Sequence, residues 1–243
     1  MPYRVSDVTV VVPAHNEQDL LESCLTSLGR AALAVPHVEV QVVLVLDSCT
    51  DRSRSIAQRL TRVPLPGLRL QTVVVAARNV GIARAAGLLA APRFPGSWYA
   101  STDADSSVPP HWLAAQLESA VDHEVFVGTV EVRDWAGRTP GLAEAYRPLY
   151  SAETGHRHVH ATNLGMRADA YWRAGGFPAL LAHEDEALIE VCEAAGMRID
   201  WSAAAPVVTS ARRSERTPDG FSAYLSALEA HAGLTDPAAE LPA

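Results

Sequence analysis

The fold is decided by residues 8–31, which read VTVVVPAHNEQDLLESCLTSLGRA. The β-branched run at 8–12 ends at Pro13, a pattern typical of a buried parallel strand. A polar turn, AHNE, follows it. Apolar residues at helical spacing then predict a helix that begins near Leu20 and closes near Gly29. This stretch therefore predicts one strand, turn and helix unit.

The same alternation repeats along the first half of the chain. Further strands are predicted at 40–46 (VQVVLVL), 70–75 and 98–101, and helices follow within SCTDRSRSIAQRL at 48–60 and NVGIARAAGLLAA at 79–91. Strands that alternate with helices are typical of a doubly wound sheet. We therefore expect an α/β fold with a Rossmann-like, mostly parallel sheet flanked by helices.

Composition excludes several classes of protein. The chain has 243 residues, of which 48% are hydrophobic and 20% charged, enough for a full core. Its net charge of −8 argues against a nucleic-acid binder. No apolar run approaches the roughly 18 residues of a membrane span, and the N-terminus lacks a signal pattern. We expect a soluble, cytoplasmic protein and leave peripheral membrane contact open.

The chain contains no internal repeat or low-complexity linker, so one domain is expected over residues 1–231. Residues 1–108 form the half of the domain whose strand ends are predicted to bind a ligand. Residues 109–231 form the second half, which is predicted to bind the molecule that reacts with this ligand. Residues 134–160 have weak periodicity and several breakers, and predict a loop-and-helix excursion over the active site. The small, polar residues at 232–243 predict a flexible tail.

Polar residues follow each predicted strand at its carboxyl end. Because such ends meet at one edge of a parallel sheet, where ligands bind, these residues should lie together. They are His15, Asn16, Glu17, Asp47, Ser48, Arg78, Asn79, Asp103 and Asp105. The sequence thus predicts an acidic crevice with a single arginine.

Asp103 and Asp105 lie one residue apart in WYASTDADSSVPP, residues 98–110. Two carboxylates so close repel each other unless a positive charge lies between them. The GxGxxG and GxxxxGK[ST] phosphate loops are missing, which leaves a divalent cation as a way to hold a diphosphate against carboxylates. Taken alone, the DxD pattern fits a polar turn and helix cap equally well.

Cysteines and histidines give weaker signals. The three cysteines are scattered, with no CxxC pair, so we expect small buried side chains. His156, His158 and His160 alternate and can share one face of an extended segment. A metal cluster and a polar, substrate-contacting loop both remain open for them.

The motifs together resemble a known family. In order and spacing, VVVPAHNEQDLLESCLTSL, VVLVLDSCTDRS, ARNVGIARAAG and STDADSSVPPHWL resemble the nucleotide-sugar domain of family-two glycosyltransferases with the GT-A fold. The segment HATNLGMRADAYWRAGGFPALLAHEDEALIEVCEAAG resembles the acceptor side of that family. The resemblance covers roughly residues 6–212. It implies a single GT-A domain with an acceptor-side α/β extension.

The resemblance also implies roles for matching residues. Asp47 matches the acid that hydrogen-bonds the nucleoside base, and Asp103 with Asp105 matches the motif that holds Mg²⁺ or Mn²⁺. The residues implied to contact the nucleotide-sugar are Pro13, Ala14, Glu17, Asp47, Arg78, Gly81, Asp103 and Asp105.

On the acceptor side, Asp185 matches the general base of inverting members, and Glu184 supports it. Asn163, Gly165 and Arg212 are expected to contact the acceptor. A simpler interpretation of the two acids is that they stabilise a helix N-terminus.

The chain departs from the family in the region VVTSARRSERTPDGF. Relatives often supply a third metal ligand there, frequently a histidine, whereas here no histidine occurs before His231. Arg212, Arg213 and Arg216 can instead hold a diphosphate or an anionic acceptor, or form a solvated basic loop. The QxxRW motif of processive synthases is absent, which favours transfer of a single sugar.

The sequence therefore predicts a metal-dependent, inverting hexosyltransferase. It would move a sugar from a nucleotide-diphosphate donor to a hydroxyl of a small or lipid-linked acceptor, with a homodimer left open. One alternative is a sugar-nucleotide nucleotidyltransferase, although such enzymes carry a Gly-rich loop with a basic residue where this chain has PAHNE. The other alternative is a non-catalytic nucleotide-sugar-binding protein.

Overall fold

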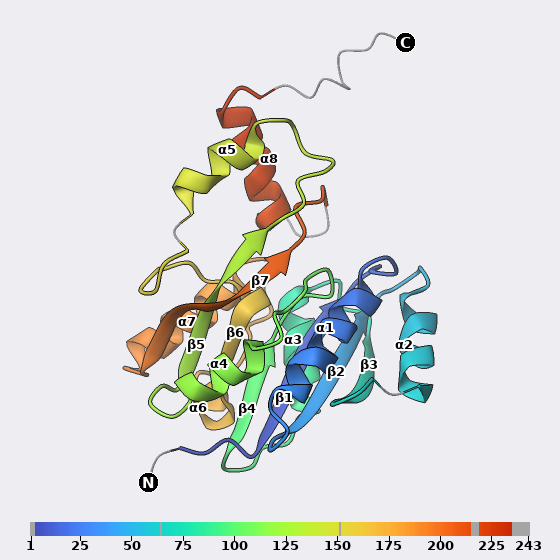
Figure 1. The fold of residues 1–243 in the computed structure, drawn as a ribbon, viewed down its shortest axis with the longest axis vertical. Helices are drawn as coiled ribbons and strands as arrows, with labels where there is room; N and C mark the ends of the chain where they lie inside the picture. The colour runs from blue at the N-terminus through green and yellow to red at the C-terminus, as the bar shows by residue number, and fades with distance from the viewer. Residues whose placement is uncertain (1–2, 64, 151, 215–218, 235–243) are drawn as a thin grey trace.

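A computed structural model describes residues 3–63, 65–150, 152–214 and 219–234. These residues form a seven-stranded sheet with the order β3-β2-β1-β4-β6-β5-β7 (Figure 1). Strand β6 runs antiparallel to β4 and β5, and the other neighbouring strands pair in parallel. The predicted mostly parallel α/β sheet is confirmed.

The elements follow the predicted order. The strands are β1 Asp7–Ala14, β2 Glu39–Asp47, β3 Arg69–Val75, β4 Ser97–Ser101, β5 Val125–Val132, β6 Leu164–Arg167 and β7 Ile199–Thr209. The α-helices are α1 Leu21–Leu33, α2 Ser53–Arg62, α3 Val80–Leu89, α4 Trp112–Ser119, α5 Leu142–Tyr146, α6 Ala168–Arg173, α7 Glu184–Ala194 and α8 Phe221–His231. Two short 3₁₀ helices are η1 Arg147–Leu149 and η2 Ala161–Asn163.

Both faces of the sheet are covered, which explains its uninterrupted apolar strands. On one face, Val10 of β1 packs with Leu25 of α1 and Trp112 of α4. On the other face, Val11 belongs to the cluster that contains Ala83 of α3 and Ile189 of α7. Successive β1 residues thus contribute to opposite cores, as a pleated strand requires.

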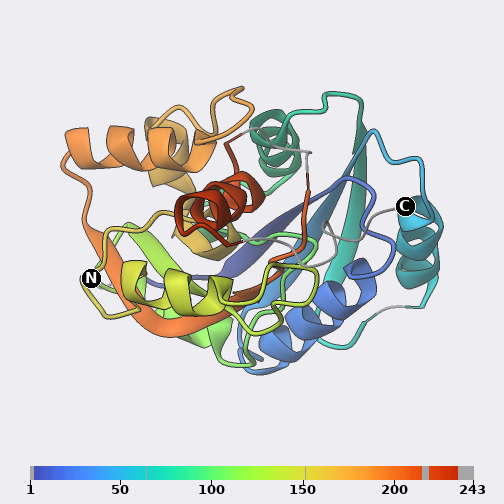
Figure 2. The same ribbon diagram turned by 90° about the horizontal axis from the view of Figure 1, so that it is seen from above.

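A smaller unit extends beyond the carboxyl ends of the strands. Helices α5 and α8 pack together around Leu142, Tyr146 and Leu225, and in the view from above α8 lies over the end of the sheet (Figure 2). The predicted excursion at 134–160 contains α5 and η1. We call the α5–η1 segment and α8 together the roof.

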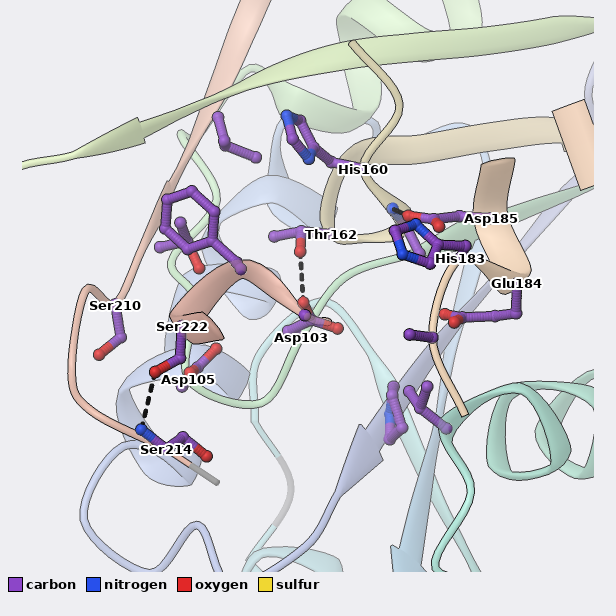
Figure 3. A pocket seen from close by; sticks show the side chains of 18 of the residues that line it. Asp103, Asp105, His160, Thr162, His183, Glu184, Asp185, Ser210, Ser214 and Ser222 are labelled. Atoms are coloured by element: carbon purple, nitrogen blue, oxygen red, sulfur yellow. Dashed lines mark hydrogen bonds between the residues drawn. The ribbon is translucent and has the colours of Figure 1, made fainter. Parts of the chain in front are cut away.

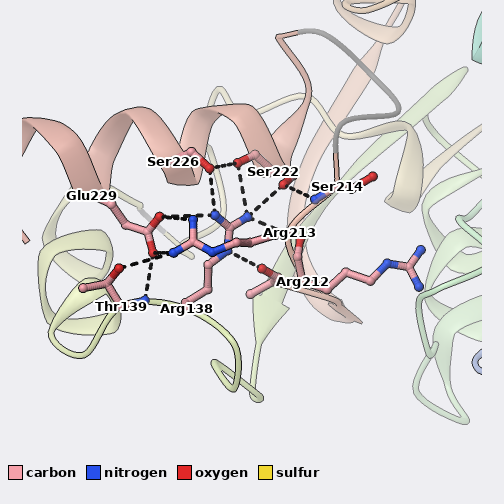
Figure 4. A network of polar contacts seen from close by, with 9 residues as sticks. Arg138, Thr139, Arg212, Arg213, Ser214, Ser222, Ser226 and Glu229 are labelled. Atoms are coloured by element: carbon pink, nitrogen blue, oxygen red, sulfur yellow. Dashed lines mark hydrogen bonds and ion pairs between the residues drawn. The ribbon is translucent and has the colours of Figure 1, made fainter. Parts of the chain in front are cut away.

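A buried arginine holds the roof together. The Arg138 guanidinium donates hydrogen bonds to Ser222, to Ser226 and to the carbonyl of Ala211, and pairs with Glu229 (Figure 4). Arg213 also pairs with Glu229, at 2.8 Å. Because Arg138 and Glu229 are both buried, this network gives the roof a fixed shape.

The remaining sequence expectations concern the tail, the cysteines and the membrane. Residues 232–234 follow α8, whereas the rest of the predicted flexible tail lies outside the described residues. Cys24 and Cys192 are buried, as expected, whereas Cys49 is only partly buried. No helix in the described ranges combines the length and apolar character that crossing a membrane requires.

Asn163 and Gly165 do not lie where the sequence analysis placed them. Asn163 is 0% exposed; its amide donates to the carbonyls of Thr129 and Ala205 and accepts from the indole N–H of Trp112. A Cβ on Gly165 would lie 2.2 Å from the Gln116 side chain. Both residues belong to the interior of the sheet, so their assignment as acceptor contacts is corrected.

We predict that Asn163→Leu lowers the free energy of unfolding by about 3 kcal/mol, because it leaves a buried indole N–H and two buried carbonyls without partners. Urea titration followed by tryptophan fluorescence measures the loss. The exposed Gln71→Leu on edge strand β3 is the control and should change stability by less than about 0.5 kcal/mol. Equal effects of the two substitutions would contradict the role given to Asn163.

Candidate active site

A cavity of about 800 Å³ opens at the carboxyl edge of the sheet, beneath the roof. Strand ends form its floor, and α7, the 158–162 segment and the roof form its walls (Figure 3). The predicted site residues that line it are Pro13, Ala14, Glu17, Asp47, Arg78, Asp103, Asp105, Glu184, Asp185 and Arg212.

The loops after β1, β2 and β3 share one backbone feature. Each contains a non-glycine residue in the left-handed region: Asn16 with φ 55°, Ser48 with φ 52° and Arg78 with φ 47°. Such conformations cost energy and persist only where surrounding contacts hold them. Here the Asn16 side chain accepts a hydrogen bond from the N–H of Thr50, which ties the first two loops together.

Asp47 shapes the third loop. Its carboxylate accepts hydrogen bonds from the N–H groups of Ala77, Arg78 and Asn79 at 2.8–3.1 Å, and from the Ser48 hydroxyl. Burial acts to raise the pKa of Asp47, but these donors together hold it below its ordinary value. Asp47 therefore fixes the backbone on which Arg78 reaches the cavity.

The centre of the site is a buried arginine, Arg84 of α3, whose side chain is 4% exposed. Its guanidinium pairs with Asp103 at 2.5 Å and, on its other side, with Glu184. Its Nε also donates to the Ser101 hydroxyl at 3.2 Å. Arg84 thus joins the loop after β4 to the first residue of α7.

Asp103 is held from two directions. It pairs with Arg84 and also accepts a hydrogen bond from the hydroxyl of Thr162 (Figure 3). The positive charge beside Asp103 in this structure is the Arg84 guanidinium, whereas the sequence analysis expected a divalent cation next to the two aspartates.

Arg84 and Arg212 line the cavity together with Arg78, so the expectation of a single arginine is wrong. Arg84 was not predicted as a site residue. The sequence did contain a sign of this role, because Arg84 lies at helical spacing from Gly81 and Leu88 and is therefore a charged residue on the buried face of α3.

Gly81 has a packing role that corrects the sequence assignment. It does not line the cavity, and a Cβ there would lie 2.1 Å from the carbonyl oxygen of Pro178 and 3.2 Å from Cβ of Glu184. The missing side chain lets α3 approach the start of α7. That approach brings Arg84 within reach of Glu184.

Asp105 lies beside a second arginine. Burial and the neighbouring Asp103 charge raise the pKa of Asp105 to about 7, while Arg212 acts in the opposite direction. Arg212 lies 3.2 Å from the Asp105 carboxylate and also pairs with Glu17. It was predicted to contact the acceptor, whereas the structure places it with the acids that follow β1 and β4.

Of the other two arginines of that predicted basic loop, the structure describes Arg213. Arg213 pairs with Glu229 in the roof, a structural contact. Arg216 lies outside the described residues.

Glu184 and Asp185 open α7, directly after His183 with φ 60°. Glu184 is buried against Arg84, and burial raises its pKa although Arg84 opposes the shift. Asp185 instead accepts hydrogen bonds from the backbone N–H groups of Ala161, at 2.7 Å, and Glu186. The two adjacent acids therefore have different partners, and both line the cavity.

Asp103 and Asp105 suit a hard cation, since both are carboxylates and Mg²⁺ and Mn²⁺ prefer oxygen ligands. Burial and the neighbouring Asp103 charge raise the pKa of Asp105 to about 7. A cation between the two carboxylates would offset both their mutual repulsion and the loss of solvation. Within the described ranges, no three His, Cys, Asp or Glu side chains converge as a metal site. The protein would thus supply two ligands and leave the others to phosphate and water.

The three alternating histidines do not converge on a point. The rings of His156 and His158 stack at 5.9 Å with planes 14° apart, and those of His158 and His160 at 6.3 Å with planes 15° apart. Among the described residues, no group of three such side chains could hold a metal ion. Of the two interpretations left open, the metal cluster is not supported.

Comparison with known proteins identifies the family. The profile of glycosyl transferase family 2 matches residues 9–176, more than half of the chain. The chain belongs to this family. This family 2 glycosyltransferase is also 27% identical over 163 residues to the uncharacterized glycosyltransferase EpsJ of Bacillus subtilis (strain 168), a match that spans 65% of this chain and 44% of EpsJ.

Solved structures share the GT-A fold of this glycosyltransferase. Staphylococcus aureus TarS 1–349 in complex with UDP-GlcNAc has a TM-score of 0.64 at 17% identity, over 88% of this chain and 61% of that one. The mannosyltransferase PcManGT from Pyrobaculum calidifontis, in complex with GDP-Man and Mn²⁺, has a TM-score of 0.64 at 20% identity, over 89% and 61%. The chain therefore spans about three fifths of each.

We predict that Arg84→Met lowers the free energy of unfolding by about 3–5 kcal/mol, because two acids lose their buried partner. Adding Glu184→Gln to Arg84→Met should recover part of this lost stability, since it removes one of the two carboxylate charges that have lost their cationic partner. Both are measured by urea unfolding.

The control is Arg59→Met, which breaks an exposed pair with Glu22 and should change stability little. If Arg84→Met and Arg59→Met have the same effect, the Arg84 pairs do not hold the site together.

Proposed function

We propose that this glycosyltransferase moves a sugar from a nucleotide-diphosphate donor to a hydroxyl of a small or lipid-linked acceptor, with inversion at the anomeric carbon. The observation that carries the proposal is the Arg84 bridge, which joins Asp103 to the helix that presents Asp185. Donor-side and acceptor-side acids thereby face one cavity. The proposal includes a cytoplasmic location, and sedimentation would decide whether the chain forms the homodimer that the sequence left open.

The donor is placed at the strand ends. The nucleoside would lie against Pro13, Ala14 and Glu17, over the loop that Asp47 holds, and the diphosphate would extend past Arg78 toward Asp105. The structures of TarS with UDP-GlcNAc and of PcManGT with GDP-Man support a donor of this class. Which base and sugar this chain takes is a matter for a donor screen.

Asp103 and Asp105 would hold Mg²⁺ or Mn²⁺. When bound, the cation neutralises charge that grows on the leaving diphosphate. Arg212 contributes a further positive charge beside Asp105, and Glu17 orients it. Arg84 stays buried and holds the Asp103 carboxylate in place.

Asp185 would act as the general base. The N–H of Ala161 fixes one of its carboxylate oxygens, which sets the direction of the other lone pairs. Asp185 accepts the proton of the acceptor hydroxyl as the oxygen bonds to the anomeric carbon and the bond to the diphosphate breaks. Displacement from the opposite face inverts that carbon. Glu184, bound by Arg84, supports the start of α7.

Two alternatives from the sequence are disfavoured. A nucleotidyltransferase would need a glycine-rich, basic loop after β1, and this loop instead carries Glu17 and the left-handed Asn16. A non-catalytic binding protein would have no use for Asp185 at the cavity wall. Membership of glycosyl transferase family 2 also argues against both.

We predict that nucleotide binding requires a divalent cation held by Asp105. Calorimetry with UDP and GDP should show affinity in Mn²⁺ that falls when a chelator is added. Asp105→Asn should remove most of the cation-dependent part, whereas the exposed Asp122→Asn should not. Equal affinity with and without chelator, in wild type and Asp105→Asn alike, would contradict metal binding at this site.

We predict that Asp185→Asn lowers transfer by roughly 10²–10⁴-fold, because the amide cannot take the proton. Donor and metal affinity should change little. Glu193→Gln, on the exposed side of the same helix, is the matched control. Product NMR should show the inverted anomer. Transfer by Asp185→Asn at nearly the wild-type rate would move the base elsewhere, with Glu184 as the next candidate.

A further inference from the structure

One short turn of the chain holds two acids of the site. Ala161 and Thr162 are consecutive residues of η2, and both line the cavity. The N–H of Ala161 donates a hydrogen bond to the Asp185 carboxylate at 2.7 Å, and the hydroxyl of Thr162 donates one to the Asp103 carboxylate (Figure 3). The turn therefore contacts both the proposed general base and one of the two proposed cation ligands.

The turn is itself anchored in the core. Its last residue, Asn163, is buried and donates to the carbonyls of Thr129 at 2.8 Å and Ala205 at 2.9 Å, and it accepts from the indole N–H of Trp112 at 2.8 Å. The backbone N–H of Asn163 donates to the carbonyl of His160 at 2.9 Å, which closes the turn. Because these partners belong to β5, β7 and α4, η2 is a fixed support for the two acids.

The Thr162 contact completes the fixation of Asp103. One carboxylate oxygen, Oδ1, pairs with Arg84, and the other, Oδ2, accepts the hydrogen bond from Thr162. Rotation of a carboxylate about the bond to its Cβ has only shallow preferences, so a single donor leaves the plane of the group free to turn. Donors on both oxygens fix that plane, and with it the direction of the remaining lone pairs.

A simpler explanation is that Thr162 only satisfies its own buried hydroxyl. Two other threonines argue against it. The hydroxyls of Thr102, directly before Asp103, and of Thr129 in β5 are buried and have no hydrogen-bond partner within the described part of the chain. Burial alone thus does not require a threonine in this region to find a partner, and the contact with Asp103 is particular to Thr162.

We propose that Thr162 is a positioning residue for the divalent cation. Its hydroxyl orients the Asp103 carboxylate toward the cation, and the same anchored turn orients Asp185 through Ala161. The turn thereby keeps the cation and the base in a fixed relation to each other. This inference rests on the proposed function and adds to it a residue that acts on the cation through Asp103.

The experiment measures Mn²⁺ binding to the full chain, with and without UDP, from the loss of the EPR signal of free Mn²⁺. Thr162→Val keeps the branched shape of the side chain and removes the hydroxyl. Groups that hold a metal ligand in place typically contribute about 10- to 100-fold to metal affinity or activity, so we expect Thr162→Val to raise the Kd for Mn²⁺ roughly 10-fold. Urea unfolding of each variant checks that folded protein is compared.

Two further variants separate positioning from packing. Thr162→Ser keeps the hydroxyl and should restore most of the Mn²⁺ affinity. Thr102→Val removes a buried hydroxyl next to Asp103 that has no partner among the described residues, and should leave the affinity unchanged. A merely structural role of Thr162 would lower the free energy of unfolding of Thr162→Val without changing its Kd for Mn²⁺.

The outcomes distinguish this role from the proposed donor function. If Thr162→Val binds Mn²⁺ as tightly as the wild type, or if Thr162→Ser or Thr102→Val binds it as weakly as Thr162→Val, the positioning role is wrong. Failure of the wild type to bind Mn²⁺ in either condition would also overturn it. A wild type that binds Mn²⁺ but neither UDP nor GDP would contradict the donor instead, and the Thr162 variants would still be compared on Mn²⁺ alone.

Discussion

The structure depends on one buried cation, the Arg84 guanidinium. It lies between Asp103 and Glu184, which without it would be two acids in a poorly solvated space. Its position follows from how closely α3 packs on the sheet, since a Cβ on Gly87 would lie 2.4 Å from Val11. A buried pair is weak evidence for stability by itself, but it fixes geometry. The loop after β4 and the start of α7 are therefore tied to each other through Arg84.

The fold could be predicted from sequence because its signals are local. The β-branched runs at 8–12 and 40–46 and the helical spacing after them give strands and helices confirmed to within a few residues. The DAD and HED motifs were also placed in one cavity. What could not be predicted were partners far apart in the chain. Arg84 and Glu184 are 100 positions apart, and Arg212 and Glu17 are 195 positions apart.

Asn163 and Gly165 show a second limit. They lie close in sequence to residues that do face the cavity, such as Thr162, yet they point into the interior. Thr162 and Asn163 are neighbours in the short 3₁₀ helix η2, where successive residues point in different directions, so one position decides between a ligand contact and a core contact. The sequence motif showed which segment lies near the cavity, but not which of its residues face the cavity. The contacts of Arg212 could not be predicted for another reason, because only the path of the chain after β7 brings this residue to Asp105.

The roof has its own small core and its own buried ion pair, Arg138 with Glu229, and shares few of the contacts that stabilise the sheet. Substitutions that are far apart and have no common partner act nearly independently on stability. The cavity-facing positions of the roof can therefore vary without disturbing the strand ends beneath. Substitutions at cavity-facing roof positions such as Leu149 and Tyr224 would reshape one wall of the cavity and leave the strand ends on its floor unchanged.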